Sequence, residues 1–202
     1  MKLYFAPDSR AVRVAWALEE LGLDYEIETF QLGDKAMRAP DYLKVHPMGR
    51  VPALEDGDVT LFESGAILQY LLARYDPDHR LSTSPDHPDF PAYLQWFHYA
   101  EGMVMPPVNS ITVETVLLPP ERRSEVHAKR ALKLLGQMLT AVERHVDGRE
   151  FLAGAFSGAD IMTGSAVMVA RRMGADFSDK PNLAAYAERL AARPALQKAN
   201  TL

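Results

Sequence analysis

The sequence contains no cysteine, and this absence excludes more chemistry than any other feature of its composition. Without thiols the chain has no disulfide framework, no Cys-ligated metal site and no thiol nucleophile of its own. Such a composition is typical of a reducing compartment, so we expect a cytoplasmic protein. No apolar run approaches the ~20 residues of a bilayer span, and no signal-peptide pattern precedes the first strand. Neither membrane insertion nor secretion is therefore expected.

The sequence is also poor in clustered positive charge. Its 22 Lys and Arg are outnumbered by 27 Asp and Glu, which gives a formal net charge of −5. Proteins whose main partner is nucleic acid or an anionic membrane usually carry the opposite balance, so neither partner is expected. The six His residues are scattered. His98 and Glu101 share one helix face, but no third ligand accompanies them, and we predict no metal site.

The first third of the chain has the pattern of a strand–helix–strand unit. Residues 2–5 read as a strand, 10–21 as a helix that stops at Gly22, and 25–30 as a second strand. In the helix, Arg13 and Glu20 fall opposite the apolar face. The connection between the two strands is expected to be right-handed. A short helix is predicted near residues 41–45.

The rest of the chain is wholly helical in pattern. A Pro-rich stretch, 76–91, precedes it. We predict a helix over 90–105 that breaks at Pro106-Pro107, a long helix ending at about Val146, a central helix to about Arg172, and a last helix over 183–192. Ser157 and Asp160 have the spacing of a capping box at the start of the central helix, which gives Asp160 a structural role.

The stretch from His46 to Leu68, HPMGRVPALEDGDVTLFESGAIL, carries the strongest functional signal. It predicts a turn, a strand over 51–54, a hairpin loop over 55–58, a strand over 59–62 and a helix from about 65 to 75. Ser64 stands where strand gives way to helix, a place suited to capping and to binding an anion. If the Val51-Pro52 bond is cis, Val51 exposes backbone groups with which a small peptide could pair. The alternative is an ordinary edge hairpin followed by a capped helix.

Three groups of motifs resemble one family. R-V-P-A-L, a hairpin and E-S-G-A-I look like the glutathione site of the soluble glutathione transferases. F-L-A-G-A-F-S-G-A-D-I resembles the capping box of their C-terminal domain, and H-P-M-G-R and W-F-H-Y-A-E-G are similar to a fungal and bacterial branch. The resemblance covers essentially the whole chain. It implies a thioredoxin-like α/β domain over 1–78, a linker over 79–87, and an all-α helical bundle domain over 88–202.

The resemblance also implies an activity. The protein is expected to bind glutathione as co-substrate, stabilise its thiolate and conjugate it to a small hydrophobic electrophile. The same thiolate could attack organic peroxides. A homodimer is the usual state in the family. Two other functions remain open: a protein-interaction module that keeps the fold without catalysis, and a thiol-disulfide oxidoreductase, which the missing cysteine opposes.

Three residues are candidates for activating the glutathione thiol. Ser9 matches the serine of the Ser-type, plant-like members, and its hydroxyl could donate to the sulfur at a helix N-terminus; an ordinary helix cap is the other interpretation. Tyr4 matches the tyrosine of the animal Tyr-type members, although a strand tyrosine is more often buried. Arg10 stands near the position at which Cys-type members carry cysteine, and it could act only as a cation.

The residues expected to hold glutathione follow from the motifs. Val51, followed by Pro52, should pair with the cysteinyl backbone. Glu63 should bind the ammonium and Ser64 the carboxylate of the γ-glutamyl end, and Arg50 is a candidate for the glycyl carboxylate. The weaker candidates are Gln31, Lys35 and Arg38 for the glycyl end, and Glu101 for the γ-glutamyl amine across a dimer interface.

Overall fold

The computed structural model describes residues 1–202, and its internal contacts divide the chain into two units. The first unit is Met1–Ser82 together with Ala191–Leu202, and the second is Thr83–Leu190. The boundary near residue 82 falls inside the predicted linker. The last residues, Ala191–Leu202, belong to the first unit, whereas the sequence predicted one domain over 88–202. No helix combines the length and the apolar character that crossing a bilayer requires.

The first unit is built on a mixed sheet of four strands in the order β2-β1-β3-β4. The strands are β1 (Lys2–Phe5), β2 (Glu26–Thr29), β3 (Ala53–Asp56) and β4 (Val59–Phe62). β1 pairs in parallel with β2, Leu3 opposite Ile27, and antiparallel with β3, Leu3 opposite Leu54. The parallel pair and the intervening helix form the strand–helix–strand unit that the pattern predicts.

The hairpin differs from its prediction by two residues. β3 begins at Ala53 and not at Val51, because Pro52 has no N–H to give to a sheet ladder. Glu55 and Asp56 belong to the strand, and Asp56 pairs with Val59, which leaves a two-residue turn. Val51 therefore lies just outside the sheet.

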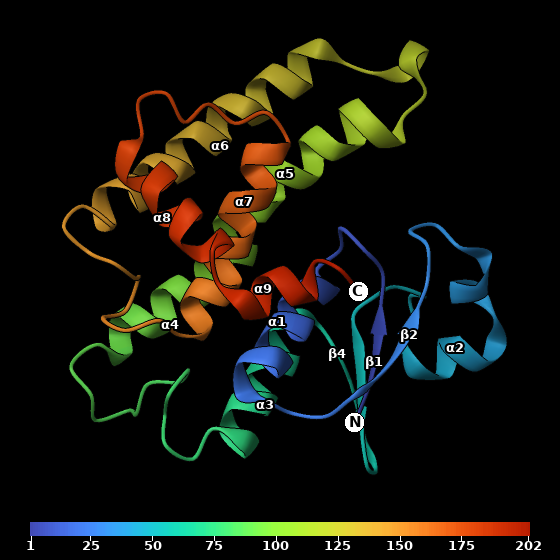
Figure 1. The fold of residues 1–202 in the computed structure, drawn as a ribbon. Helices are drawn as coiled ribbons and strands as arrows, with labels where there is room; N and C mark the ends of the chain where they lie inside the picture. Colours follow the sequence, from blue (N-terminus) through green and yellow to red (C-terminus); the bar gives the residue numbers. More distant parts are fainter. The chain divides into compact units, whose positions relative to one another are not determined.

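Helices cover the sheet on both sides. α1 (Ala11–Leu21) and α3 (Ser64–Tyr75) pack against each other and against the sheet, while η1 (Lys35–Arg38) and α2 (Pro40–Val45) lie on the opposite side (Figure 1). Successive side chains of a strand point to opposite faces, so Leu3 and Phe5 point away from the side on which Tyr4 lies. Tyr4 packs in an aromatic cluster with Phe30, Met37, Tyr42 and Ala53.

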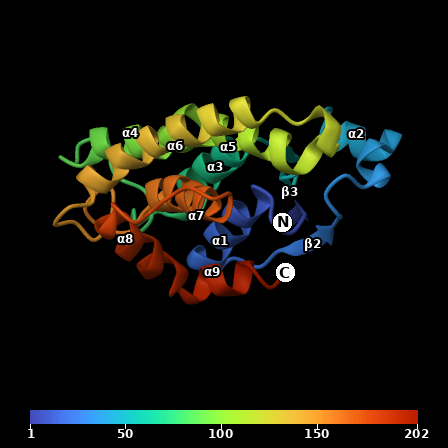
Figure 2. The same cartoon turned by 90° about the horizontal axis from the view of Figure 1, so that it is seen from above.

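A short C-terminal helix, α9 (Pro194–Ala199), runs beside α1 in both views (Figures 1 and 2). The Arg193 guanidinium makes a bidentate ion pair with Glu20, with Nε–Oε1 at 2.6 Å and Nη2–Oε2 at 2.8 Å. Lys198 contacts Glu19 at 2.7 Å. The polar edge of α1 thus binds the end of the chain, although no helix was predicted after the one over 183–192. Proline is accepted at the first position of a helix, where no N–H is required.

The second unit is wholly helical. α5 and α6 run side by side (Figure 1). Its main elements are α4 (Phe90–Tyr99), η2 (Ala100–Val104), α5 (Met105–Thr112), η3 (Val113–Leu117), η4 (Pro120–Arg122), α6 (Glu125–His145), η5 (Asp160–Gly164), α7 (Ser165–Arg172) and α8 (Pro181–Ala191). Ser124 caps the N-terminus of α6, and its hydroxyl accepts from the His127 N–H. The all-α character is as predicted.

The predicted break at Pro106-Pro107 is wrong. The π-helical turn η2 separates α4 from α5, so both prolines fall in the first turn of α5. The Met105 N–H still donates to the Ala100 carbonyl of the π-helical turn, and the two prolines that follow have no N–H to donate. The helical path consequently continues through η3 to Leu117.

The predicted capping box at the start of the central helix is confirmed. The Asp160 carboxylate accepts from the Ser157 N–H at 2.9 Å and the Leu152 N–H at 3.0 Å. The Ser157 and Tyr186 hydroxyls also donate to it. Burial raises the pKa of Asp160 to about 6, and the four donors oppose that shift. Asp160 therefore joins the loop before η5, the helix itself and α8.

We predict that Asp160→Ala lowers the melting temperature. The substitution leaves several buried donors without an acceptor, which costs about 2–4 kcal/mol, or very roughly 5–15 °C in a chain of this size. Thermal unfolding followed by circular dichroism measures the shift. Asp176→Ala removes an exposed carboxylate that accepts from the nearby Ser178, and should change the melting temperature little. An unchanged melting temperature for Asp160→Ala would show that the structural role is misassigned.

Candidate functional site

The N-terminus of α3 has the geometry of an anion site. β4 ends at Phe62, Glu63 turns the chain with φ 76° and ψ 111°, and Ser64 opens the helix. A positive φ is uncommon for a residue other than glycine and is found most often where function requires the conformation. The first helical hydrogen bond runs from the Ile67 N–H to the Glu63 carbonyl. The N–H groups of the preceding residues thus have no helical acceptor, and they lie at the positive end of the helix dipole, where an anion can bind.

The Ser64 hydroxyl accepts a hydrogen bond from a buried arginine. The Arg13 Nη1 donates to the Ser64 Oγ at 3.3 Å, and the two residues are 2% and 3% exposed. The sequence pattern placed Arg13 on the polar face of α1, so its burial is a correction. The contact joins residues 51 positions apart, which no local pattern reveals. Arg13 is the charged residue of this site that sequence reasoning missed.

Glu63 itself is exposed, and its carboxylate forms no hydrogen bond or ion pair within the chain. Its charge acts on His46, whose ring packs on Phe62 at a centroid distance of 4.8 Å. Burial lowers the pKa of His46; the Glu63 carboxylate opposes that effect and Arg50 adds to it. Glu63 therefore presents a carboxylate beside Ser64 that is available to a cation.

Val51 also presents unused hydrogen-bonding groups. The Val51-Pro52 bond is cis, and Val51 takes no part in the sheet ladder. Its N–H and C=O bond to no other group in the chain. An extended peptide could pair with these two groups as a short added strand.

The segment before Val51 is fixed from α2. The Tyr42 hydroxyl donates to the Arg50 carbonyl at 2.6 Å, and its ring packs on Phe30 and Tyr4 at centroid distances of 4.8 and 5.3 Å. Burial raises the pKa of Tyr42 well above its usual range, which keeps the hydroxyl protonated as a donor. The aromatic cluster therefore supports the site through one hydrogen bond, and Tyr42 is a second residue that the sequence did not indicate.

Gly49 allows the turn before Arg50 to close on η1. Its φ is +54°, and a Cβ at this position would lie 2.2 Å from the Met37 carbonyl and 3.1 Å from the Arg38 Cδ. Only glycine tolerates that approach and that backbone angle. Of the three weaker glycyl-end candidates, Arg38 is the one that the structure places beside this turn.

Ser9 and Tyr4 lie in different surroundings. The Ser9 hydroxyl donates to the Ala6 carbonyl at 2.7 Å and accepts from the Ala11 N–H at 3.1 Å, just before α1. The Tyr4 hydroxyl donates to Glu55 at 2.8 Å from inside the aromatic cluster. Burial and Glu55 raise the pKa of Tyr4, against the effect of Lys2. Both hydroxyls therefore already donate to a group within the chain. Arg10 is the half-buried residue at the N-cap of α1.

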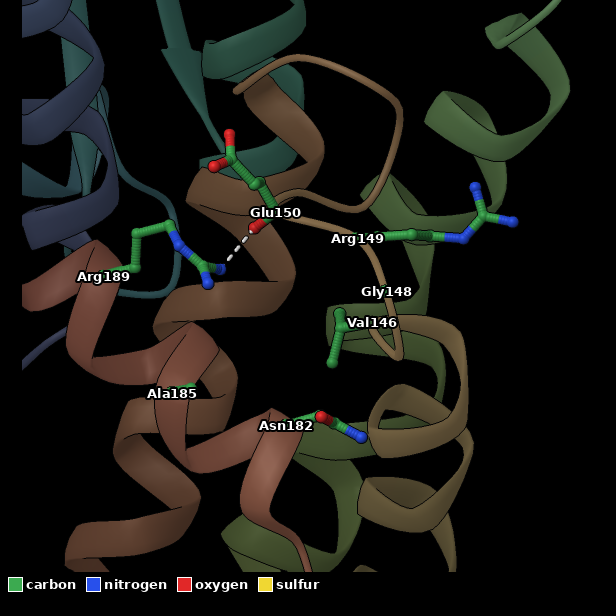
Figure 3. Close-up of a pocket in the computed structure, with 7 residues that line it drawn as sticks. All are labelled: Val146, Gly148, Arg149, Glu150, Asn182, Ala185 and Arg189. Carbon is green, nitrogen blue, oxygen red and sulfur yellow. Dashed lines mark hydrogen bonds between the residues drawn. The ribbon is translucent and has the colours of Figure 1, made fainter.

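The second unit contains a shallow hollow of about 240 Å³ (Figure 3). Two of its polar side chains are engaged: Arg189 donates to the Glu150 carbonyl at 2.7 Å, and Asn182 bonds the Glu143 carboxylate at 2.9 Å. Glu143 also accepts from the Leu183 N–H and so caps α8. The structure gathers no three His, Asp or Glu side chains in a metal-binding arrangement.

These features define a class: a thioredoxin-like unit with an anion-binding helix start and a free backbone edge, joined to an all-helical unit. Comparison with known proteins agrees. Residues 1–73 match the glutathione S-transferase N-terminal domain, and residues 105–194 match the glutathione S-transferase C-terminal domain. Glutathione S-transferase 3 of Zea mays is 35% identical over 209 aligned residues, which cover 98% of this chain and 92% of the relative. The chain belongs to the glutathione S-transferase family.

Solved structures show the same fold. The glutathione transferase URE2P8 of Phanerochaete chrysosporium, crystallised with oxidized glutathione, superposes with a TM-score of 0.88 at 27% identity, covering 98% of this chain and 92% of that one. Ure2p5 from the same organism, cocrystallised with 1-(S-glutathionyl)-2,4-dinitrobenzene, gives 0.86 at 27% identity, covering 99% and 92%. The predicted fold class, a thioredoxin-like domain followed by a helical one, is confirmed.

We predict that Tyr42→Phe loosens the candidate site while the fold is kept. Removing the hydroxyl frees the Arg50 carbonyl and should lower the free energy of unfolding by about 1–2 kcal/mol. NMR relaxation should report a lower backbone order parameter at Val51. The matched control is Tyr99→Phe, which removes a similar bond from Tyr99 to the Met138 carbonyl in the helical unit. The control should lose comparable stability and leave Val51 unchanged; equal order parameters in both variants would contradict the assignment.

Proposed function

We propose that this protein is a glutathione transferase that binds glutathione along Val51 and the start of α3 and conjugates it to a small apolar electrophile. One observation carries the proposal. Within one unit, Val51 offers a free backbone edge, while Ser64 and Glu63 offer an anion site beside an unpaired carboxylate. Those are the complements of a peptide backbone, a carboxylate and an ammonium, all of which glutathione carries.

The bound peptide must also supply the thiol. The chain has no cysteine, so the nucleophilic sulfur is that of glutathione. A thiol with a pKa near 8.5 is mostly protonated at neutral pH, and only the thiolate attacks. The protein therefore has to lower that pKa; the proton leaves to solvent, and the sulfur forms a C–S bond as the leaving group departs.

Ser9 is the proposed donor to the thiolate. A helix N-terminus favours a nearby negative charge by ~0.3–1 kcal/mol, and a hydrogen bond to a charged group adds ~1.5–3 kcal/mol. Together they lower the thiol pKa by about one to three units. In the free protein the Ser9 hydroxyl donates to the Ala6 carbonyl. On binding it would rotate from that carbonyl to the sulfur, which a serine hydroxyl does without moving the backbone.

Each end of glutathione has a proposed place. Val51 pairs with the cysteinyl residue, Glu63 binds the γ-glutamyl ammonium, and Ser64 binds the γ-glutamyl carboxylate. Arg50, with Arg38 beside its turn, would bind the glycyl carboxylate. Cytoplasmic location, detoxification as the physiological role and assembly as a homodimer are proposed from the family. Exposed Met48 and Phe62, beside His46, offer apolar surface for such an assembly.

The proposed binding site predicts the effect of Glu63→Ala. Loss of the carboxylate should weaken glutathione binding at least about tenfold, because a charge-assisted bond to the ammonium is lost. Calorimetric titration with glutathione measures the affinity. The control is Glu121→Ala, which removes an exposed carboxylate in η4. No binding to the wild type at millimolar glutathione would indicate a protein that keeps the fold without the chemistry.

The proposed thiol activation predicts different effects for Ser9→Ala and Tyr4→Phe. Ser9→Ala should raise the pKa of bound glutathione by about one unit or more, because the thiolate loses a donor. Tyr4→Phe should leave that pKa unchanged, since the Tyr4 hydroxyl is bound to Glu55. Ultraviolet absorbance of the thiolate, recorded as the pH is varied, gives both values. The reverse outcome would make Tyr4 the donor.

A further inference from the structure

His46 lies between the two parts of the proposed glutathione site. It is the residue at the C-terminal end of α2, and it is 5% exposed. Its ring packs on Phe62, the residue before Glu63, at a centroid distance of 4.8 Å. The turn that follows His46 leads to Arg50 and Val51. One buried ring therefore lies next to both segments to which the ligand is proposed to bind.

The turn after α2 is held by His46 in its neutral form. The Met48 N–H donates to the His46 Nδ1 at 3.3 Å, and the Gly49 N–H donates to the His46 carbonyl at 2.8 Å. An imidazole nitrogen accepts a hydrogen bond only when it carries no proton, so the neutral ring has its hydrogen on Nε2. A proton added to Nδ1 makes that nitrogen a donor. The Met48 N–H then loses its acceptor within the chain.

The charges near the ring set how readily it takes up that proton. Burial has the largest effect and lowers the pKa of His46, and the Arg50 guanidinium lowers it further. The Glu63 carboxylate and the carbonyl of His46 itself act in the opposite direction. β4 carries no charged side chain, and the two charged side chains of α2, Lys44 and Asp41, pair with each other at the surface at 2.7 Å. Glu63 is thus the acidic side chain that stabilises a protonated His46.

The same Glu63 carboxylate is the proposed partner of the γ-glutamyl ammonium. When this carboxylate binds the ammonium of a ligand, it stabilises a protonated imidazole less, because two cations then repel each other across one anion. Each cation therefore weakens the binding of the other, and such a coupling is reciprocal.

We infer that His46 is a positioning residue whose neutral ring is required for tight glutathione binding, because it holds the turn before Val51 and leaves Glu63 to the γ-glutamyl ammonium. The inference rests on the proposed function and adds to it a control by pH. Affinity is full while the ring is neutral and falls as the pH drops through the pKa of His46, which burial places below the usual ~6.5. Glutathione that binds in this range displaces a proton from His46 to the solvent.

The test uses S-methylglutathione, which keeps both carboxylates and the ammonium of glutathione but has no thiol to ionise. The full-length protein is titrated calorimetrically at about pH 7.5 and at about pH 5, which bracket the titration of a histidine. Repeating each titration in buffers of different ionisation enthalpy gives the number of protons released. We expect the wild type to bind about fivefold or more weakly at the lower pH, and to release protons on binding only there.

The variant that tests the residue is His46→Asn. The asparagine oxygen lies near the place of Nδ1 and can accept from the Met48 N–H, but the amide does not titrate. We expect its affinity to change less than about twofold between the two pH values, with no proton released, because nothing is left to couple to Glu63. A pH dependence equal to that of the wild type would overturn the inference, whatever the affinity, since His46 would then have only a structural role.

The matched control is His79→Asn. His79 is an exposed histidine of the same unit, and its Nδ1 lies 2.9 Å from the Ser82 hydroxyl oxygen. This variant should keep the pH dependence of the wild type. If the control lost that dependence, the titrating group would be His79 and the inference would be overturned.

Two further outcomes keep the inference separate from the proposed function. A wild type that does not bind S-methylglutathione at the higher pH refutes both, because a transferase must also hold its S-substituted product. A wild type that binds it equally well at both pH values refutes the inference alone. If His46→Asn does not fold, His46→Gln decides: its amide does not titrate either, so the pH dependence should be lost at whatever affinity remains. A dependence that persists in His46→Gln would overturn the inference.

Discussion

The alternation of side chains along β1 organises the whole first unit. Leu3 and Phe5 point to one face of the sheet, and Tyr4 points to the other, into the cluster that holds α2. β1 is also the strand that joins the parallel and the antiparallel halves of the sheet. The start of α1, the start of α3 and the free edge at Val51 all depend on where this strand lies.

The candidate site is assembled from groups that the fold leaves unused. Val51 has no partner in the sheet ladder, because Pro52 has no N–H to donate. The first N–H groups of α3 have no helical acceptor, because no helical turn comes before them. Glu63 has a positive φ, which is uncommon, and this angle turns the chain from β4 into α3. Two side chains hold these groups by hydrogen bonds: Tyr42 donates to the Arg50 carbonyl, and Arg13 donates to the Ser64 hydroxyl. A ligand would meet backbone and hydroxyl groups that are already held in place.

The missing cysteine has a mechanistic consequence in this arrangement. Members of the fold with a thiol of their own can carry out redox chemistry, whereas this chain can only activate a thiol that it binds. Its chemistry is therefore a matter of holding a peptide and stabilising one negative charge. Helix N-termini suit that task because their unpaired N–H groups favour anions, and both Ser9 and Ser64 lie at such positions.

The sequence by itself determined the features that depend on neighbouring residues. The strand–helix–strand unit, the hairpin with Gly57 in its turn, the capping box at Asp160 and the division into an α/β and an all-α part all follow from local periodicity and local hydrogen bonds. The predicted hairpin boundaries were shifted by two residues, because a proline changes where a ladder can begin.

Only the tertiary structure decided which polar groups are buried and which residues they contact. Arg13 looked like a surface residue, yet it contacts Ser64, and Arg193 folds back on Glu20 over a separation of 173 positions. Pro106 and Pro107 were expected to end a helix, but a preceding π-helical turn makes them the start of one. In each case the deciding partner lies beyond the reach of a local pattern, because a side chain's polarity does not specify which distant group will satisfy it.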